Sequence, residues 1–122
     1  MAATAYSKVN NEVALLMVTS GCGSTNAITG ILDAWQDSNK VFVISGQANS
    51  NELRNPYLTA RNTGIQHVDI ITMVRDITKY SEMLTVPQNI PAALEIAYEN
   101  CISGRPGPVW LDIPLDVQAM EI

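Results

Sequence analysis

The segment from residue 13 to residue 35 constrains the fold of this chain most strongly. Residues 13–18 form a short, unbroken apolar run of strand length, a pattern typical of a parallel strand buried on both faces. Beyond the polar residues 19–26, apolar residues recur at helical spacing, namely Ile28, Ile31, Leu32 and Trp35. A strand, a tight turn and a helix in this order predict an α/β fold built on a parallel sheet.

The turn at residues 19–26 reads Thr-Ser-Gly-Cys-Gly-Ser-Thr-Asn. Its two glycines permit a sharp turn and a close approach to a ligand, and Ser24, Thr25 or Asn26 is expected to cap the helix that follows. The carboxyl end of a parallel strand is the usual ligand position in α/β proteins. The spacing matches neither the P-loop nor the dinucleotide fingerprint, and no lysine follows the glycines, so a phosphate site is disfavoured. The residues alone leave open whether this is a ligand-contacting loop or a structural turn.

Strands and helices alternate along the remaining chain. We expect strands at residues 41–44, 77–83 and 108–113, a short helix over residues 68–74, and a longer helix over residues 89–104. In the longer helix, Asn89 is expected to be the cap, and the inner stripe is expected to comprise Ile90, Leu94, Ala97 and Cys101. This alternation predicts an open parallel sheet flanked by helices.

Two further segments bear on domain organisation. Residues 49–64, which include Asn55-Pro56, predict a long surface loop, and loops of that length are usually functional or at an interface. Residues 1–8 read as the last turns of a helix with no cap. Because only about four strands are predicted, we expect a single partial domain over residues 1–122 that lacks its first strand and helix.

Composition excludes several classes of function. The chain has 122 residues, 47% of them hydrophobic, and a net charge of −5 without a basic cluster, which argues against nucleic acid or an anionic membrane as a partner. No apolar run reaches the roughly 20 residues that span a bilayer, and the start does not read as a signal peptide, so a cytoplasmic location is expected. Two cysteines and one histidine, without ligand spacing, predict neither a disulfide framework nor a metal site.

A series of short motifs runs in order over nearly the whole chain: Thr19–Asn26, Gly30 with Asp37-Ser38, Ile44–Gln47, Gly64–Gln66, Ile77–Lys79, Gly104–Val109, Asp112–Pro114 and Asp116–Gln118. Together they resemble the N-terminal pyrimidine-binding domain of thiamine-diphosphate enzymes, and most closely its acetolactate-synthase-like branch. The resemblance implies a parallel sheet flanked by helices that holds the aminopyrimidine ring across a subunit interface, in a homo-oligomer (dimer or tetramer). It assigns the diphosphate and Mg²⁺ to a separate domain of the partner chain, and it leaves FAD as a possible but unsupported cofactor.

The resemblance also implies roles for particular residues. Thr19, Cys22 and Asn26 match positions close to the cofactor ring, and Gln66 matches a glutamine that lines the active site. The family usually has proline in place of Cys22 and an acidic residue in place of His67. Its activating glutamate, which starts the attack on a 2-oxo acid, matches a position upstream of Met1.

No residue of this sequence replaces that activating glutamate. Glu12 lies at the entrance to the first strand rather than on the preceding helix, so we expect no catalytic residue here and no activity from this chain alone.

Three hypotheses follow. The chain contributes the aminopyrimidine half of the site in a thiamine-diphosphate-dependent 2-oxo acid carboligase or decarboxylase. Alternatively, it is a non-catalytic interaction or oligomerisation module. A thiol enzyme built on Cys22 is disfavoured, because no histidine lies close to it in sequence to act as its base. Asp112, in a predicted buried strand, is expected to be structural, with Arg105 or backbone N–H groups as partners, while Trp35 and Trp110 are expected to pack in the core or at an interface.

Overall fold

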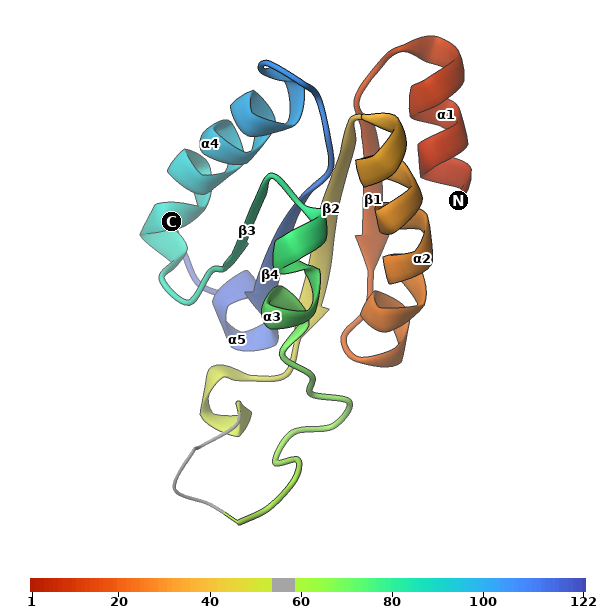
Figure 1. Ribbon diagram of the computed structural model, residues 1–122. Coiled ribbons are helices and arrows are strands. Elements are labelled where there is room, and N and C mark those ends of the chain that lie inside the picture. Colours follow the sequence, from red (N-terminus) through yellow and green to blue (C-terminus); the bar gives the residue numbers. More distant parts are fainter. Residues whose placement is uncertain (54–58) are drawn as a thin grey trace.

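A single parallel sheet organises the molecule. A computed structural model describes residues 1–53 and 59–122 and contains the strands β1 (Ala14–Val18), β2 (Val41–Gln47), β3 (Tyr80–Met83) and β4 (Val109–Pro114). The strands lie in the order β1-β2-β4-β3, and every neighbouring pair is parallel. The predicted α/β architecture with an open parallel sheet is confirmed (Figure 1).

Helices cover both faces of this sheet. They are α1 (Ala2–Asn10), α2 (Cys22–Asp37), α3 (Ile70–Val74), α4 (Ile90–Ile102) and α5 (Leu115–Gln118), with 3-10 turns at Ser50–Glu52, Arg75–Ile77 and Pro87–Asn89. In Figure 1, α2 and α3 lie on one face of the sheet and α4 lies on the other. Within the described residues, no helix is both long enough and apolar enough to cross a bilayer.

The two central strands supply side chains to both faces. In β2, Val43 packs against α2 and α3, while its neighbour Phe42 packs against α4. In β4, Trp110 belongs to the first cluster and Leu111 to the second. Because successive side chains of a strand point to opposite faces, an unbroken apolar run serves a strand with helices on both sides.

The start of α2 differs from the prediction. The helix begins at Cys22 with Gly21 as its N-cap, and no side chain caps it, so the expected cap by Ser24, Thr25 or Asn26 is wrong. Ser24 instead donates from Oγ to the carbonyl of Thr19 (2.8 Å). The physical reason is the backbone of Gly21: its φ of 58° turns the chain into the helix three residues earlier than a side-chain cap would.

Three details of the C-terminal half also differ. The third strand begins at Tyr80 rather than at Ile77, because residues 75–77 form a 3-10 turn. Asn89 makes no side-chain cap bond with α4. The buried stripe of α4 comprises Ala93, Ala97 and Cys101, whereas Leu94 is 37% exposed, so the expected inward position of Leu94 is wrong. Ala93, Ala97 and Cys101 pack in one buried cluster with Phe42, Val109 and Leu111 of the sheet, so this stripe and not Leu94 faces the strands.

The predicted loop at residues 49–64 begins with the short turn Ser50–Glu52. That turn is closed by reciprocal bonds between Asn49 and Glu52, and Ser50 donates from its backbone N–H to Asp116 (2.9 Å). Asn55-Pro56 lies outside the described residues.

The β1 edge of the sheet presents apolar side chains. Leu15 is 60% exposed and Met17 is 70% exposed, so the expectation that residues 13–18 form a strand buried on both faces is wrong. The reason is that β1 is an edge strand, covered by helices on one face only at these positions. Leu15 also lines a groove of about 1020 Å³ between β1, β2 and α4, together with Val13, Phe42, Ile44, Leu94, Tyr98 and Ile102. Another chain can pair with an exposed edge strand that also has an apolar face.

Leu111→Ala is expected to destabilise the fold by about 2–5 kcal/mol, because Leu111 is fully buried in β4 and its removal leaves a cavity. Leu115→Ala is the matched control: the side chain is 59% exposed, and its removal should change the free energy of unfolding by less than about 0.5 kcal/mol. Urea unfolding monitored by tryptophan fluorescence measures both. Equal losses in the two variants would contradict the placement of the core.

Candidate functional site

A cavity lies where β1, β2 and β4 end. Its volume is about 560 Å³, and its walls come from the ends of these strands and from α5: Met17, Val18, Thr19, Ser20, Ile44, Ser45, Gly46, Gln47, Ile113, Leu115 and Gln118. The walls are mostly apolar, with a few hydroxyl and amide groups among them. Carboxyl ends of parallel strands are where α/β proteins hold ligands, and Thr19 was expected at such a site from the sequence.

Gly21 and Gln66 lock two distant segments together beside this cavity. Both have a positive φ, 58° for Gly21 and 57° for Gln66. A Cβ atom on Gly21 would lie 2.2 Å from the carbonyl oxygen of Gln66 and 2.7 Å from its Cβ. The backbone of Gln66 therefore packs directly on Gly21, in a space that only a glycine leaves open.

This contact brings Gln66 to the edge of the sheet that carries Thr19 and the start of α2, although of the predicted site residues only Thr19 lines the cavity. Thr19 ends the strand segment, and its methyl group packs where Gly23 has no side chain, 2.6 Å from a Cβ placed there. Cys22 and Asn26 are exposed and lie one turn apart on α2, so they share a face of that helix. Gln66 joins them through its contact with Gly21.

Cys22 occupies the first helical position of α2, and its thiol is exposed. The first helical position is the one at which proline is favoured, because its missing N–H is not needed there. The local geometry thus accepts either cysteine or proline.

A buried carboxylate lies beneath the cavity. Asp112 is fully buried, and it accepts bonds from Ser45 Oγ (2.5 Å) and Gln47 Nε2 (2.9 Å). Trp110 Nε1 in turn donates to Ser45 Oγ (2.8 Å). Burial raises the pKa of Asp112 to about 6, although the bonds from Ser45 and Gln47 act in the opposite direction and the charge of Asp69 adds to the rise.

The structural role expected for Asp112 fits this burial, but the expected partners, Arg105 or backbone N–H groups, are wrong, because the bonds described for this carboxylate come from two side chains. Arg105 lies at the opposite edge of the sheet, where it donates to the carbonyl of Gln36 (3.1 Å) and to Ser38 Oγ (2.6 Å). The actual partners follow from strand register, since Ser45 lies directly opposite Asp112 in the β2–β4 pair. In the sequence, the signal that could have identified these partners is the motif Ser45-Gly46-Gln47, which directly follows a predicted strand.

Gln47 extends this network to His67. Its Nε2 also donates to the carbonyl of Val68 (2.8 Å), and its Oε1 lies 3.2 Å from His67 Nδ1. Reasoning from the sequence missed Gln47 and Ser45 as site residues. The carboxyl edge therefore joins a buried acid, an amide and an imidazole in one chain of hydrogen bonds.

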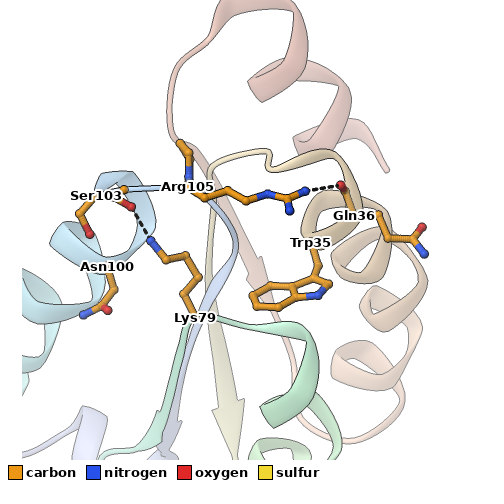
Figure 2. Close-up of a pocket in the computed structure, with 8 residues that line it drawn as sticks. Trp35, Gln36, Lys79, Asn100, Ser103 and Arg105 are labelled. Atoms are coloured by element: carbon orange, nitrogen blue, oxygen red, sulfur yellow. Dashed lines mark hydrogen bonds between the residues drawn. The ribbon is translucent and has the colours of Figure 1, made fainter.

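A second cavity, of about 630 Å³, lies at the amino edge of the sheet (Figure 2). It lies between Trp35, Lys79, Asn100 and Arg105, and none of the residues predicted for the site lines it. Lys79 Nζ donates to the carbonyl of Ser103 (2.6 Å), and Arg105 binds the carbonyl of Gln36, so both cations bind carbonyls at helix C-termini. Their contacts indicate a structural role. Trp35 is 39% exposed here, whereas Trp110 is fully buried in the core as expected.

No group of three or more His, Cys, Asp or Glu side chains within residues 1–53 and 59–122 is arranged to hold a metal ion.

Residues 1–73 match the family model described as "Thiamine pyrophosphate enzyme, N-terminal TPP binding domain". The chain belongs to this family. It is 41% identical over 99% of its length to the acetolactate synthase large subunit of Corynebacterium glutamicum, and 37% identical over 98% to that of Lactococcus lactis. The probable acetolactate synthase large subunit of Methanocaldococcus jannaschii is 36% identical over 99% of the chain. The chain spans about a fifth of the length of these relatives (18–20%).

Membership of the family confirms the resemblance read from the motifs. It makes thiamine diphosphate the relevant cofactor for this thiamine pyrophosphate enzyme domain. The cavity at the carboxyl edge fits a planar heterocycle in one respect that the structure shows: apolar walls with a few polar groups are what such a ring requires.

Gly21→Ala is expected to destabilise the chain far more than Gly104→Ala. Both glycines have a positive φ, so each substitution carries a backbone cost, and Gly21 also has a ψ of −111°, outside the left-handed helical region that other residues adopt. A Cβ at Gly104 meets nothing within 4 Å, whereas one at Gly21 collides with Gln66. Urea unfolding of the two variants measures the difference, to which the collision and the backbone of Gly21 both contribute, and equal losses would contradict the packing of Gln66 on Gly21.

The pKa of Asp112 predicts a pH dependence of stability. A pKa raised from 3.8 to about 6 on folding gives a contribution that is fully present below about pH 4 and is lost as the pH rises through 6. Relative to Asp112→Asn, which cannot titrate, the wild type should lose on the order of 3 kcal/mol between pH 4 and pH 7. The lowered pKa values of Asp69 and Asp116 act oppositely but are common to both proteins. Parallel pH profiles in urea unfolding would contradict the burial of Asp112.

Proposed function

We propose that this chain contributes the aminopyrimidine half of a thiamine-diphosphate site in a 2-oxo acid carboligase or decarboxylase of the acetolactate-synthase type. The observation that carries the proposal is the contact of Gly21 with Gln66. It brings Gln66 to the edge where Thr19, Cys22 and Asn26 lie, and these are the positions that the family resemblance places at the cofactor.

The proposed roles are binding and orientation. Thr19 lines the cavity at the end of β1, while Cys22 and Asn26 offer exposed polar atoms on the first turns of α2. Gln66 carries an amide, which can orient a polar ligand from a backbone fixed against Gly21. When bound, thiamine diphosphate supplies the carbanion chemistry by which a 2-oxo acid loses carbon dioxide and passes its acyl carbon to an acceptor.

The chain is proposed to depend on other parts of an enzyme. The resemblance assigns the diphosphate and Mg²⁺ to a separate domain of a partner subunit, and it matches the activating glutamate to a position before Met1. The 122 residues alone are therefore proposed to be inactive, and the active form to be a homo-oligomer.

The second candidate, a non-catalytic interaction or oligomerisation module, is favoured by one observation. The apolar groove beside β1, with Leu15 at 60% exposure, is a surface for association that needs no cofactor. This function predicts self-association of the chain in sedimentation experiments, together with no contribution to catalysis.

A chimera tests the proposed function. The matching segment of the Corynebacterium glutamicum acetolactate synthase large subunit, 41% identical over 121 residues, is replaced by this chain. The chimera should form acetolactate from pyruvate, and Gln66→Ala in it should lower kcat/KM on the order of 10- to 100-fold through lost positioning of the ligand. Gln88→Ala, an exposed glutamine in the turn before α4, is the matched control and should leave kcat/KM unchanged.

A folded chimera without activity would overturn the proposed function and favour the interaction module. The isolated chain gives the complementary measurement: calorimetric titration with thiamine diphosphate and Mg²⁺ should show no micromolar binding, because most of the charged contacts are proposed to come from the partner domain.

A further inference from the structure

The segment that carries Gln66 is attached to the rest of the molecule by tertiary contacts. Residues 64–68 lie outside the helices and strands, and the side chain of Gln66 is exposed, so its position depends on its backbone. One contact is the packing of that backbone on Gly21. A second follows two residues later, where the carbonyl of Val68 accepts a hydrogen bond from Gln47 Nε2 (2.8 Å).

The amide of Gln47 is a fixed link between this segment and the sheet. The side chain is 4% exposed, and its Nε2 donates to Asp112 Oδ2 (2.9 Å) as well as to Val68, while its Oε1 accepts from the backbone N–H of Ala48 (3.0 Å). An amide nitrogen has two N–H donors and an amide oxygen has none. The reversed amide would set its oxygen against two acceptors, so the network fixes the orientation that binds Val68.

Asp112 holds the amide of Gln47 from inside the protein. Its carboxylate is fully buried and also accepts from Ser45 Oγ (2.5 Å), and Trp110 Nε1 in turn donates to that hydroxyl (2.8 Å). A hydrogen bond to a charged acceptor is stronger than one between neutral groups. Without the carboxylate, one buried N–H of Gln47 loses its acceptor, and the orientation that binds Val68 is no longer favoured.

We propose that Gln47 and Asp112 are positioning residues for Gln66. The bond from Gln47 to Val68 holds the backbone of residues 64–68 in place, and Asp112 fixes the amide that makes this bond. Gln47 also lines the cavity, but both of its N–H donors are used, so it acts on a ligand through Gln66. This deepens the proposed function and rests on it only for the statement that Gln66 contacts the ligand.

Backbone ¹⁵N relaxation of the labelled 122-residue chain tests the attachment of this segment without a cofactor. In Gln47→Met the amides of residues 65–68 should have lower order parameters than in the wild type. Leu111→Ala is the matched control, because it removes a buried side chain of β4 that packs in the cluster with α4, and it should leave these order parameters unchanged. Unchanged values in Gln47→Met, or an equal fall in both variants, would overturn the proposal.

Asp112 is tested by a loss and a rescue. Asp112→Ala should lower the same order parameters, whereas Asp112→Asn should preserve them, because the new amide oxygen can accept from Gln47 while its NH₂ group donates to Ser45 Oγ. Equal order parameters in these two variants would overturn the role of Asp112. If Asp112→Ala does not fold, Gln47→Met still decides the proposal.

A double-mutant cycle in the chimera shows whether Gln47 acts through Gln66. Gln47→Met should lower kcat/KM about 3- to 10-fold where Gln66 is present, and less than about 2-fold in the Gln66→Ala background. Equal losses in the two backgrounds would reveal a direct or general effect of Gln47 and would overturn the proposal.

The relaxation experiment needs no cofactor, so the positioning role and the proposed function fail separately. A segment that loosens in Gln47→Met, found together with an inactive chimera, would support the attachment by Gln47 and overturn the function. An active chimera whose residues 65–68 keep their order parameters in Gln47→Met would support the function and overturn the positioning role.

Discussion

The pairing of β2 with β4 is the interaction on which the rest of the structure depends. These central strands supply Val43 and Trp110 to one core cluster and Phe42 and Leu111 to the other, so both helical layers pack on them. Their register also sets Ser45 opposite Asp112. A buried carboxylate is costly unless it is bonded, and the pairing provides its donors. Core packing and the polar network under the site therefore have the same origin.

The site differs from the core in how it is held. Its elements meet through backbone contact rather than apolar packing, because Gly21 has no side chain where the backbone of Gln66 lies. His67, which follows Gln66 in the chain, contacts the side chain of Gln47, and Gln47 in turn donates a hydrogen bond to Asp112. A substitution in the interior can consequently alter the exposed edge without touching a ligand.

Sequence patterns were sufficient to predict the fold, because the spacing of apolar residues along helices and strands follows from the geometry of the backbone. The runs at residues 13–18 and from Val41 were correctly predicted as strands, and the alternation of elements predicted the parallel sheet. Burial on both faces was wrong for β1, because it is an edge strand on which Leu15 and Met17 are exposed. Predictions failed where two local structures compete. The N-cap of α2 is Gly21, and no serine or threonine side chain caps the helix. Residues 75–77 form a 3-10 turn before β3 and are not part of the strand. The ends of helices and strands depend on small differences in backbone energy, and no single residue in the sequence indicates them.

The sequence by itself determined the fold class and the family, since these depend on local periodicity and motif order. Only the tertiary structure decided which side chains satisfy one another. Asp112 is bonded to Ser45 and Gln47, and Arg105 is bonded to Gln36 and Ser38 at the far edge of the sheet. The physical reason is that hydrogen-bond partners are fixed by strand register and by left-handed turns such as Gln66, and both bring together residues that are far apart in the chain.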